Sequence, residues 1–201
     1  MDSRHAHPIV RWLAMGVMAL WLPGAGCGLF DTRDPLVSES DGGIWVAPIR
    51  AEILIENLER AFEAGVFTDY QRALTEDFVF IPDGTDVATF EQERPGEDVY
   101  GDWTAEVETV TAEIIWTAAG GEVELGLEFL SEQLIPEGRL RKYRYSLLVT
   151  EADQVQEYRG EAWFSLTQLT GGDWAIYEWE DVAADPQLPS WGFLKGSQRI
   201  L

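Results

Sequence analysis

The sequence predicts an α+β protein in which a curved antiparallel sheet, formed by the second half of the chain, wraps around helices from the first half. Two observations support this prediction. Residues 122–182 alternate apolar and polar side chains through four stretches separated by short turns, as consecutive strands with one buried face do. Residues 48–65 and 103–118 instead repeat their apolar side chains every three or four positions, as amphipathic helices do.

Prolines and glycines mark where the helices and loops before the sheet begin and end. The first helix is expected between Pro48, which suits a first turn, and Gly65, which suits a helix end. A shorter helix at about 68–75 and a short strand at 78–82 come next. Residues 83–102 hold many acids with several glycines and a proline, so we expect a surface loop with short helical pieces at most.

The alternation also predicts which residues face each other across the hairpins. Closing the first hairpin around Pro136 places Phe129 opposite Tyr145, and closing the second places Tyr145 opposite Gly160. A slip of one residue would turn every apolar side chain to water, so the face of each strand is well specified.

The last hairpin turns at Gly171 and Gly172 and is expected to place Tyr177, Trp179 and Asp181 on the inner face. Its outer face would then carry the interface candidates Trp163, Trp174 and Ile176. Two interpretations of this outer group stay open. It is a surface for a homodimer or another partner, or it is covered by the C-terminal tail that begins at about residue 183.

The inner face supplies the candidates for a ligand pocket, which are Tyr143, Tyr145, Tyr158, Tyr177, Trp179 and Asp181. Asp181 is the one candidate for catalysis, because poor solvation raises the pKa of a carboxylate and lets it move a proton. The alternative is that Asp181 caps backbone amides at the rim of the sheet. The tyrosines are either hydroxyl donors in a pocket or ordinary core residues.

Composition excludes several classes of function. The formal net charge of the 201-residue chain is −22, with 36 acids against 14 Lys and Arg, so nucleic acid is not an expected partner. The two histidines, His5 and His7, lie at the extreme N-terminus, and without that segment no histidine triad or imidazole-bound zinc can form. No phosphate-binding glycine loop and no metal-spaced cluster is present, so we expect no cofactor and no metal.

The N-terminus has the pattern of an export signal. Residues 12–22 form an uncharged apolar run after Arg4 and Arg11, too short to span a bilayer but suited to the core of a signal peptide. Small residues follow and end at Cys27, the only cysteine. An ordinary secretory signal or a membrane helix is the alternative to the resemblance described next.

The segment Ala25-Gly26-Cys27 resembles the end of a bacterial lipoprotein signal. The resemblance implies removal of residues 1–26, a lipid on Cys27, and a chain anchored in the bacterial cell envelope. Gly28 stands where inner-membrane lipoproteins often have Asp, which implies the outer membrane, facing the periplasm. Residues 27–43 would be a flexible tether, and residues 44–201 a single domain.

The order helix, short helix, strand, helix and meander, ending in Trp174-x-Ile176-x-x-Trp179-x-Asp181, resembles the nuclear transport factor 2-like superfamily. This α+β cone is shared by ketosteroid isomerase-like and polyketide cyclase-like (SnoaL-like) proteins. The resemblance implies a cavity between the helices and the concave sheet. Isomerase-like members use an acidic base and a Tyr–Asp oxyanion site there, but no local motif of this chain matches those roles.

Three functions remain as expectations. The favoured one is a lipid-anchored envelope protein whose cone binds a small apolar ligand or a partner without catalysis. The second is a histidine-free enzyme of the isomerase or cyclase type that uses Asp181 with a tyrosine. The third is a structural protein that dimerises through its sheet.

Overall fold

A computed structural model describes residues 44–152, 154–184 and 187–199. The expectations for the signal peptide, for Cys27 and for the tether lie outside these residues. The described helices and strands all belong to the compact unit Val37–Leu201. None of the described helices is long and apolar enough to cross a membrane.

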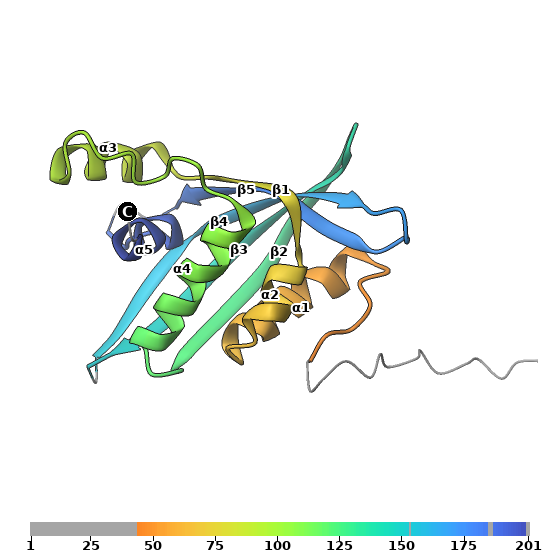
Figure 1. The fold of residues 1–201 in the computed structure, drawn as a ribbon, viewed down its shortest axis with the longest axis horizontal. Helices are drawn as coiled ribbons and strands as arrows, with labels where there is room; N and C mark the ends of the chain where they lie inside the picture. Colours follow the sequence, from red (N-terminus) through yellow and green to blue (C-terminus); the bar gives the residue numbers. More distant parts are fainter. Residues whose placement is uncertain (1–43, 153, 185–186, 200–201) are drawn as a thin grey trace, which may run out of the picture. The chain divides into compact units, whose positions relative to one another are not determined.

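The described residues form five helices and five strands, drawn in Figure 1. In chain order they are α1 (Ala51–Glu63), α2 (Phe67–Arg72), β1 (Leu74–Ile81), α3 (Gly84–Glu93), α4 (Ala105–Ala118), β2 (Val123–Ile135), β3 (Gly138–Glu151), β4 (Gln154–Gln168), β5 (Trp174–Ala183) and α5 (Trp191–Gln198).

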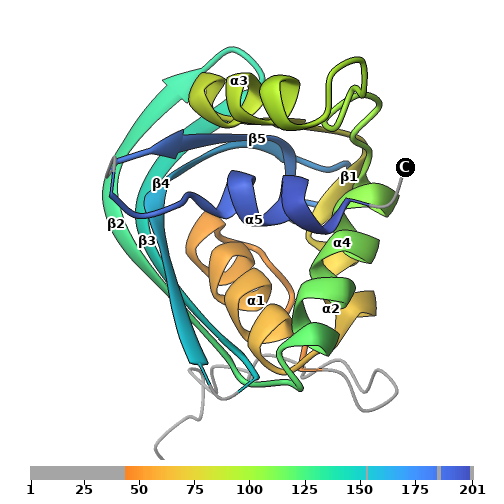
Figure 2. The same ribbon diagram turned by 90° about the vertical axis from the view of Figure 1, so that its left-hand side faces the viewer.

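The sheet has the order β1-β5-β4-β3-β2 and is mixed. The strands β2 to β5 form the predicted antiparallel meander. Strand β1 lies beside β5 and runs parallel to it, which the sequence did not indicate. Figure 2 shows the sheet curving around the helices, with α1 and α5 on its concave side. The α+β fold with a curved, open sheet is therefore confirmed.

The pairing of β2 with β3 differs from the prediction by two residues. Phe129 lies opposite Tyr143 rather than Tyr145, because the turn is tighter than expected and a bulge follows Phe129. From Val123 to Phe129 the slip is two residues, so the inner face of this part of the strand keeps the predicted side chains. The next pairing, of Tyr145 with Gly160, is confirmed.

A second bulge changes the predicted pairing of the last hairpin. Ser165 lies opposite Glu178 while Leu166 lies opposite Ile176, so Tyr177 is an extra residue in β5. The bulge turns Ile176 from the predicted outer face into the core, where it is fully buried. Beyond the bulge the prediction holds, since Asp181 lies opposite the buried Ala162.

Two helices replace segments that were expected to be irregular. The expected loop after β1 contains α3, whose N-cap Asp83 accepts a hydrogen bond from the Thr85 backbone N–H at 2.7 Å. The other oxygen of Asp83 accepts from the Ala183 N–H at 3.1 Å and ties α3 to the end of β5. The C-terminal tail contains α5, and this helix lies on the concave face rather than over the outer tryptophans.

Helix α5 approaches its neighbours closely because two of its eight residues are glycines four positions apart. A Cβ on Gly192 would lie 2.7 Å from Asp181 Oδ2, and one on Gly196 would lie 2.5 Å from the Tyr100 hydroxyl. Each glycine weakens an isolated helix by about 1 kcal/mol relative to alanine. Packing therefore stabilises this helix against its own local preference.

Gly160 in β4 likewise leaves space for the Tyr145 hydroxyl on β3, because it has no side chain. A Cβ there would collide with that hydroxyl and would lie 2.6 Å from the Val182 carbonyl oxygen. Gly126 in β2 is a matched contrast, because a Cβ there would meet only the Ser146 carbonyl oxygen, at 3.9 Å.

We predict that Gly160→Ala lowers the free energy of unfolding by about 2 kcal/mol or more, because a backbone carbonyl cannot move aside cheaply. Gly126→Ala should change it by less than about 0.5 kcal/mol. Urea denaturation of both variants measures the difference. Equal effects of the two substitutions would contradict the close packing of Tyr145 against Gly160.

Candidate functional site

The centre of the concave face is an aromatic cluster around Trp179 of β5, which is fully buried. The ring of Trp179 lies 4.6 Å from that of Trp191 on α5, 4.9 Å from Phe164 and 5.8 Å from Phe80. Trp191 also contacts Phe62 of α1 at 5.3 Å. The indole of Trp191 thus occupies the space between the sheet and α1, where the predicted cavity would lie.

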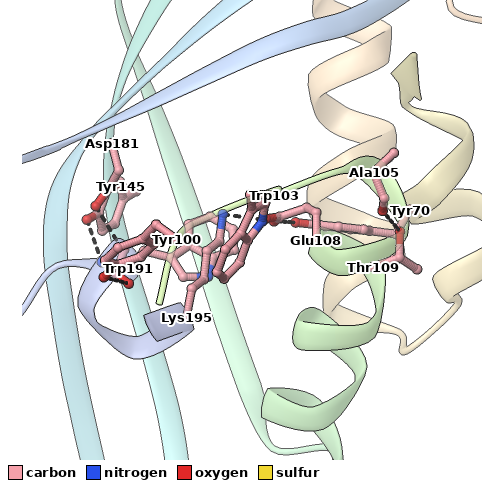
Figure 3. Close-up of polar contacts among 11 residues, drawn as sticks. Tyr70, Tyr100, Trp103, Ala105, Glu108, Thr109, Tyr145, Asp181, Trp191 and Lys195 are labelled. Atoms are coloured by element: carbon pink, nitrogen blue, oxygen red, sulfur yellow. Dashed lines mark hydrogen bonds and ion pairs between the residues drawn. The ribbon is translucent and has the colours of Figure 1, made fainter. Parts of the chain in front are cut away.

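A buried carboxylate lies beside this cluster, at Glu108 of α4 (Figure 3). Its Oε1 accepts a hydrogen bond from the Tyr70 hydroxyl at 2.8 Å, and its Oε2 accepts one from Trp103 Nε1 at 2.8 Å. Lys195 Nζ of α5 lies 2.8 Å from Oε1 and forms an ion pair. Three groups therefore satisfy a carboxylate that is fully removed from water.

The ammonium group of Lys195 is enclosed by aromatic faces as well as by Glu108. Its Nζ lies 3.2 Å from the ring centroid of Trp179, 4.1 Å from Phe80 and 5.0 Å from Trp191. Burial lowers the pKa of Lys195, and the charge of Glu108 acts in the opposite direction. A desolvated cation gains about 2 kcal/mol from such a ring, several times more than an exposed one.

Asp181 of β5 lies beside the N-terminal end of α5 and accepts a hydrogen bond from the Gly192 backbone N–H at 2.8 Å. Only 1% of its surface is exposed. Burial raises the pKa of Asp181 from 3.8 to about 6, against the opposing effects of Lys195, the Gly192 amide, and the hydroxyls of Tyr145 and Ser190. The sequence-based alternative, in which Asp181 caps backbone amides, matches this contact.

The remaining groups of the first turn of α5 are satisfied in the same region. The Trp191 N–H donates to the Tyr145 hydroxyl at 2.7 Å, and the Phe193 N–H donates to the N-cap Ser190 at 2.8 Å. The Ser190 hydroxyl donates in turn to Asp86 of α3. Two carboxylates at a helix N-terminus complement its partial positive charge, so they favour docking of α5 here.

The predicted pocket residues separate into one group of three and three single positions. Tyr145, Trp179 and Asp181 all contact α5 or lie beside it. Tyr143 instead belongs to a cluster near Arg141, described next. Tyr158 is half-buried, and Tyr177 is half-buried at the bulge of β5.

Arg141 of β3 is buried and bound by several groups. It donates to the Tyr143 hydroxyl at 3.0 Å and forms ion pairs with Glu52 at 2.5 Å and with Glu132 at 2.8 Å. Burial raises the pKa of Tyr143 to about 12. This cluster joins α1 to the β2–β3 hairpin, and the Tyr143 hydroxyl accepts its hydrogen bond there, from Arg141.

The outer face of the sheet lacks the predicted group of three exposed apolar side chains. Ile176 is buried, and Trp174 is half-buried against the core. Trp163 is half-buried, lies under Lys142 Nζ at 3.1 Å and donates to Glu161 at 2.9 Å. The bulge therefore turns Trp174 to the same face as Ile176, and the outer face presents polar and charged groups around Trp163.

Sequence reasoning missed the Glu108–Lys195 pair. A signal for Glu108 was present, because it lies on the same helical stripe as Ala105, Ala112 and Ile115, all buried. A glutamate within an apolar stripe needs a buried partner. No comparable signal marks Lys195, since its helix was not predicted.

A surface hollow opens between α3 and the start of α5. It has a volume of about 360 Å³, and its lining includes Asp86, Ser190 and Phe193 but not Asp181. Within the part of the chain that the structure describes, no group of three His, Cys, Asp or Glu side chains could hold a metal ion.

No protein-family model matches the sequence, and no curated protein matches it either. Solved structures share its fold. A putative scytalone dehydratase from Novosphingobium aromaticivorans has a TM-score of 0.51 at 10% identity, covering 69% of this chain and 88% of that chain. A putative calcium/calmodulin dependent protein kinase II association domain from Xanthomonas campestris has a TM-score of 0.50 at 14% identity, covering 70% and 94%.

A conserved protein from Planctomyces limnophilus also has a TM-score of 0.50 at 14% identity, covering 64% of this chain and 89% of that chain. At such identities the likeness shows the fold alone. That fold is the open α+β cone of nuclear transport factor 2-like proteins.

The raised pKa of Asp181 predicts a pH dependence of stability. Between pH 3.8 and about 6 the folded protein keeps a proton that the unfolded chain has lost. Stability from this group is therefore present at low pH and is lost as the pH rises through about 6. The loss is about 2 pKa units at 1.36 kcal/mol each, or about 3 kcal/mol.

Asp181→Asn should remove this pH-dependent contribution to the unfolding free energy. Relative to Asp181→Asn, the native chain should lose about 3 kcal/mol of unfolding free energy between pH 3 and pH 7. Urea denaturation across this range provides the test, with Glu137→Gln at the exposed β2–β3 turn as the control. Parallel curves for the native chain and Asp181→Asn would rule out a buried, poorly solvated carboxylate.

Proposed function

We propose that this protein is a lipid-anchored component of the bacterial cell envelope whose cone domain binds a ligand without catalysing a reaction. The observation that supports non-catalytic binding is that α5 engages the two buried carboxylates beside the aromatic cluster, Asp181 and Glu108. Asp181 and the hydroxyl of Tyr145 hold its first turn, and Glu108 holds its lysine. A general base needs an accessible lone pair and room for a substrate, and here the Trp191 indole takes that room.

The concave face is nonetheless suited to binding. Ligand pockets are mostly apolar and aromatic, with a few polar groups that converge on one place. The rings around Trp179 have this composition, because the Glu108 carboxylate is held by Trp103 and the Asp181 carboxylate lies two residues along the same strand from Trp179. A ligand would bind there by replacing part of α5.

Anchoring rests on the sequence. The apolar run at 12–22 and the small residues before the lone Cys27 support lipidation and cleavage after residue 26. More than one acyl chain on the mature terminus would give stable attachment. Residues 27–43 would then act as a tether between the membrane and the cone, and Gly28 supports an outer-membrane location facing the periplasm.

A second candidate function is acid–base catalysis of the isomerase or cyclase type. The proximity of Asp181, with its pKa near 6, to the Tyr145 hydroxyl favours it, because such a carboxyl titrates close to neutral pH. The similar protein from Novosphingobium aromaticivorans is named a putative scytalone dehydratase. Catalysis would also require α5 to leave the concave face.

Dimerisation through the sheet is a third candidate, in which the protein has an assembly role. The polar surroundings of Trp163 and the burial of Ile176 weigh against a large apolar interface there.

The anchor is tested by Cys27→Ala in a bacterial host. The variant should leave the membrane fraction or accumulate with its leader attached, because no lipid can be added. Fractionation and intact mass measure both outcomes. A variant that stays membrane-bound at the size of the native product would show that Cys27 is not the anchor.

The binding function is tested on residues 28–201, exported with a cleavable leader and purified gently from the periplasm. Native mass spectrometry should find a reproducible mass excess, which identifies a bound small molecule. A clean mass at the size of a dimer would instead support the assembly role and contradict ligand binding.

A further inference from the structure

We infer that the concave face carries a site for an alkylammonium ligand, a primary amine with an apolar body, and that α5 fills this site by placing its own Lys195 ammonium there. The inference rests on the proposed binding function and names the ligand class. We call the group formed by Glu108, Trp103, Phe80 and Trp179 the ammonium cage.

The geometry of the cage fits a primary ammonium group. A carboxylate oxygen lies 2.8 Å from the Lys195 nitrogen, and the faces of Trp179 and Phe80 lie 3.2 and 4.1 Å from it. A charge-assisted contact to a carboxylate gives direction, and aromatic faces attract a cation that has lost its water. A neutral ligand of the same shape would lack both attractions.

The cage does not depend on α5 for its construction. Phe80 belongs to β1, Trp179 to β5 and Glu108 to α4, while Trp103 immediately precedes that helix. Two of the hydrogen bonds to Glu108 come from Trp103 and Tyr70, neither of which belongs to α5. The carboxylate would therefore stay oriented toward the same point after α5 has moved away.

Helix α5 contributes the two parts that a ligand would replace. Lys195 supplies the cation, and Trp191 supplies the apolar body, which packs against Trp179 at 4.6 Å and Tyr145 at 5.8 Å. An amine with an alkyl or aryl body offers both parts in one small molecule. The chemistry of the occupant thus indicates the chemistry of the ligand.

Helix α5 is also suited to exchange. All five strands precede it in the chain, so it can undock without unpairing the sheet. Desolvation of the ammonium and carboxylate offsets much of their attraction, so this contact holds the helix less firmly than its short distance implies. A small amine competes with a tethered lysine, whose effective concentration on a flexible linker is about millimolar, and also with the packing of Trp191 against Trp179.

The charge of the whole chain favours this class of ligand. Its formal net charge is −22, so a cation is drawn toward the surface and an anion is repelled.

The first test uses the full chain from a bacterial host, held in a non-ionic detergent, and the variant Lys195→Ala. This variant leaves Glu108 facing an emptied position. Butylammonium should raise its melting temperature in a saturable way, by about 5 °C near saturation, with a Kd in the millimolar range. Butan-1-ol and potassium chloride at the same concentrations should not.

Lys142→Ala is the matched control. Lys142 Nζ lies 3.1 Å from the ring centroid of Trp163, nearly the distance between Lys195 and Trp179, but it is only half-buried. Butylammonium should not stabilise Lys142→Ala beyond the salt control. Lys195→Met, which fills the position with an apolar chain, should also show no response to the amine.

The second test needs no variant, so it applies even if Lys195→Ala fails to fold. Hydrogen exchange of the native chain should show that butylammonium accelerates exchange in α5, including the Gly192 amide held by Asp181. Exchange in α1 should stay constant, and butan-1-ol should have no effect.

The inference is overturned if the amine and the alcohol act alike on Lys195→Ala, or if α5 of the native chain is unaffected by saturating amine. A mass excess from a neutral molecule, together with no response to amines, would overturn the ammonium site and leave the binding function standing. An amine response with catalytic turnover of the amine would support the site and contradict non-catalytic binding.

Discussion

The buried ion pair between Glu108 and Lys195 is the interaction on which the arrangement of the concave face depends. It joins α4 to α5 at 2.8 Å, with both side chains removed from water. Losing either partner would leave an uncompensated charge among aromatic rings, at a cost of about 3–5 kcal/mol. Asp181 holds the Gly192 amide in the first turn of α5, and the pair holds Lys195 one turn further along, so the two contacts together fix the helix on the concave face.

This arrangement turns a fold associated with an open cavity into one whose interior its own C-terminal helix occupies. Trp191 fills the space between Trp179 and Phe62, and the acidic side chains that would serve a substrate hold α5 instead. Under the proposed binding function, the stability of the fold and the binding of a ligand therefore depend on the same residues. Groups that raise the free energy of the folded chain by being buried, such as Asp181 with its raised pKa, are the groups that a ligand would meet.

Sequence reasoning predicted the sheet well, because strand alternation reports directly which face is buried. It placed Trp179 and Asp181 on the concave face and paired Tyr145 with Gly160. It failed where one residue changes the geometry or where packing outweighs local preference. The bulge at Tyr177 moved Ile176 into the core, and the glycines of α5 concealed a helix that only its neighbours stabilise. The pairing of Glu108 with Lys195 depends on that helix, so it could not be predicted once the helix was missed.

A double-mutant cycle on Glu108 and Lys195 tests most directly whether this pair holds α5 in the cone. The variants are Glu108→Gln and Lys195→Met, and the readout is the unfolding free energy. If the two charges depend on each other in a buried site, each single change destabilises strongly, the double change costs far less than their sum, and the coupling energy is about 2–3 kcal/mol. Additive effects within about 0.5 kcal/mol would show that α5 is not held in the cone by this pair.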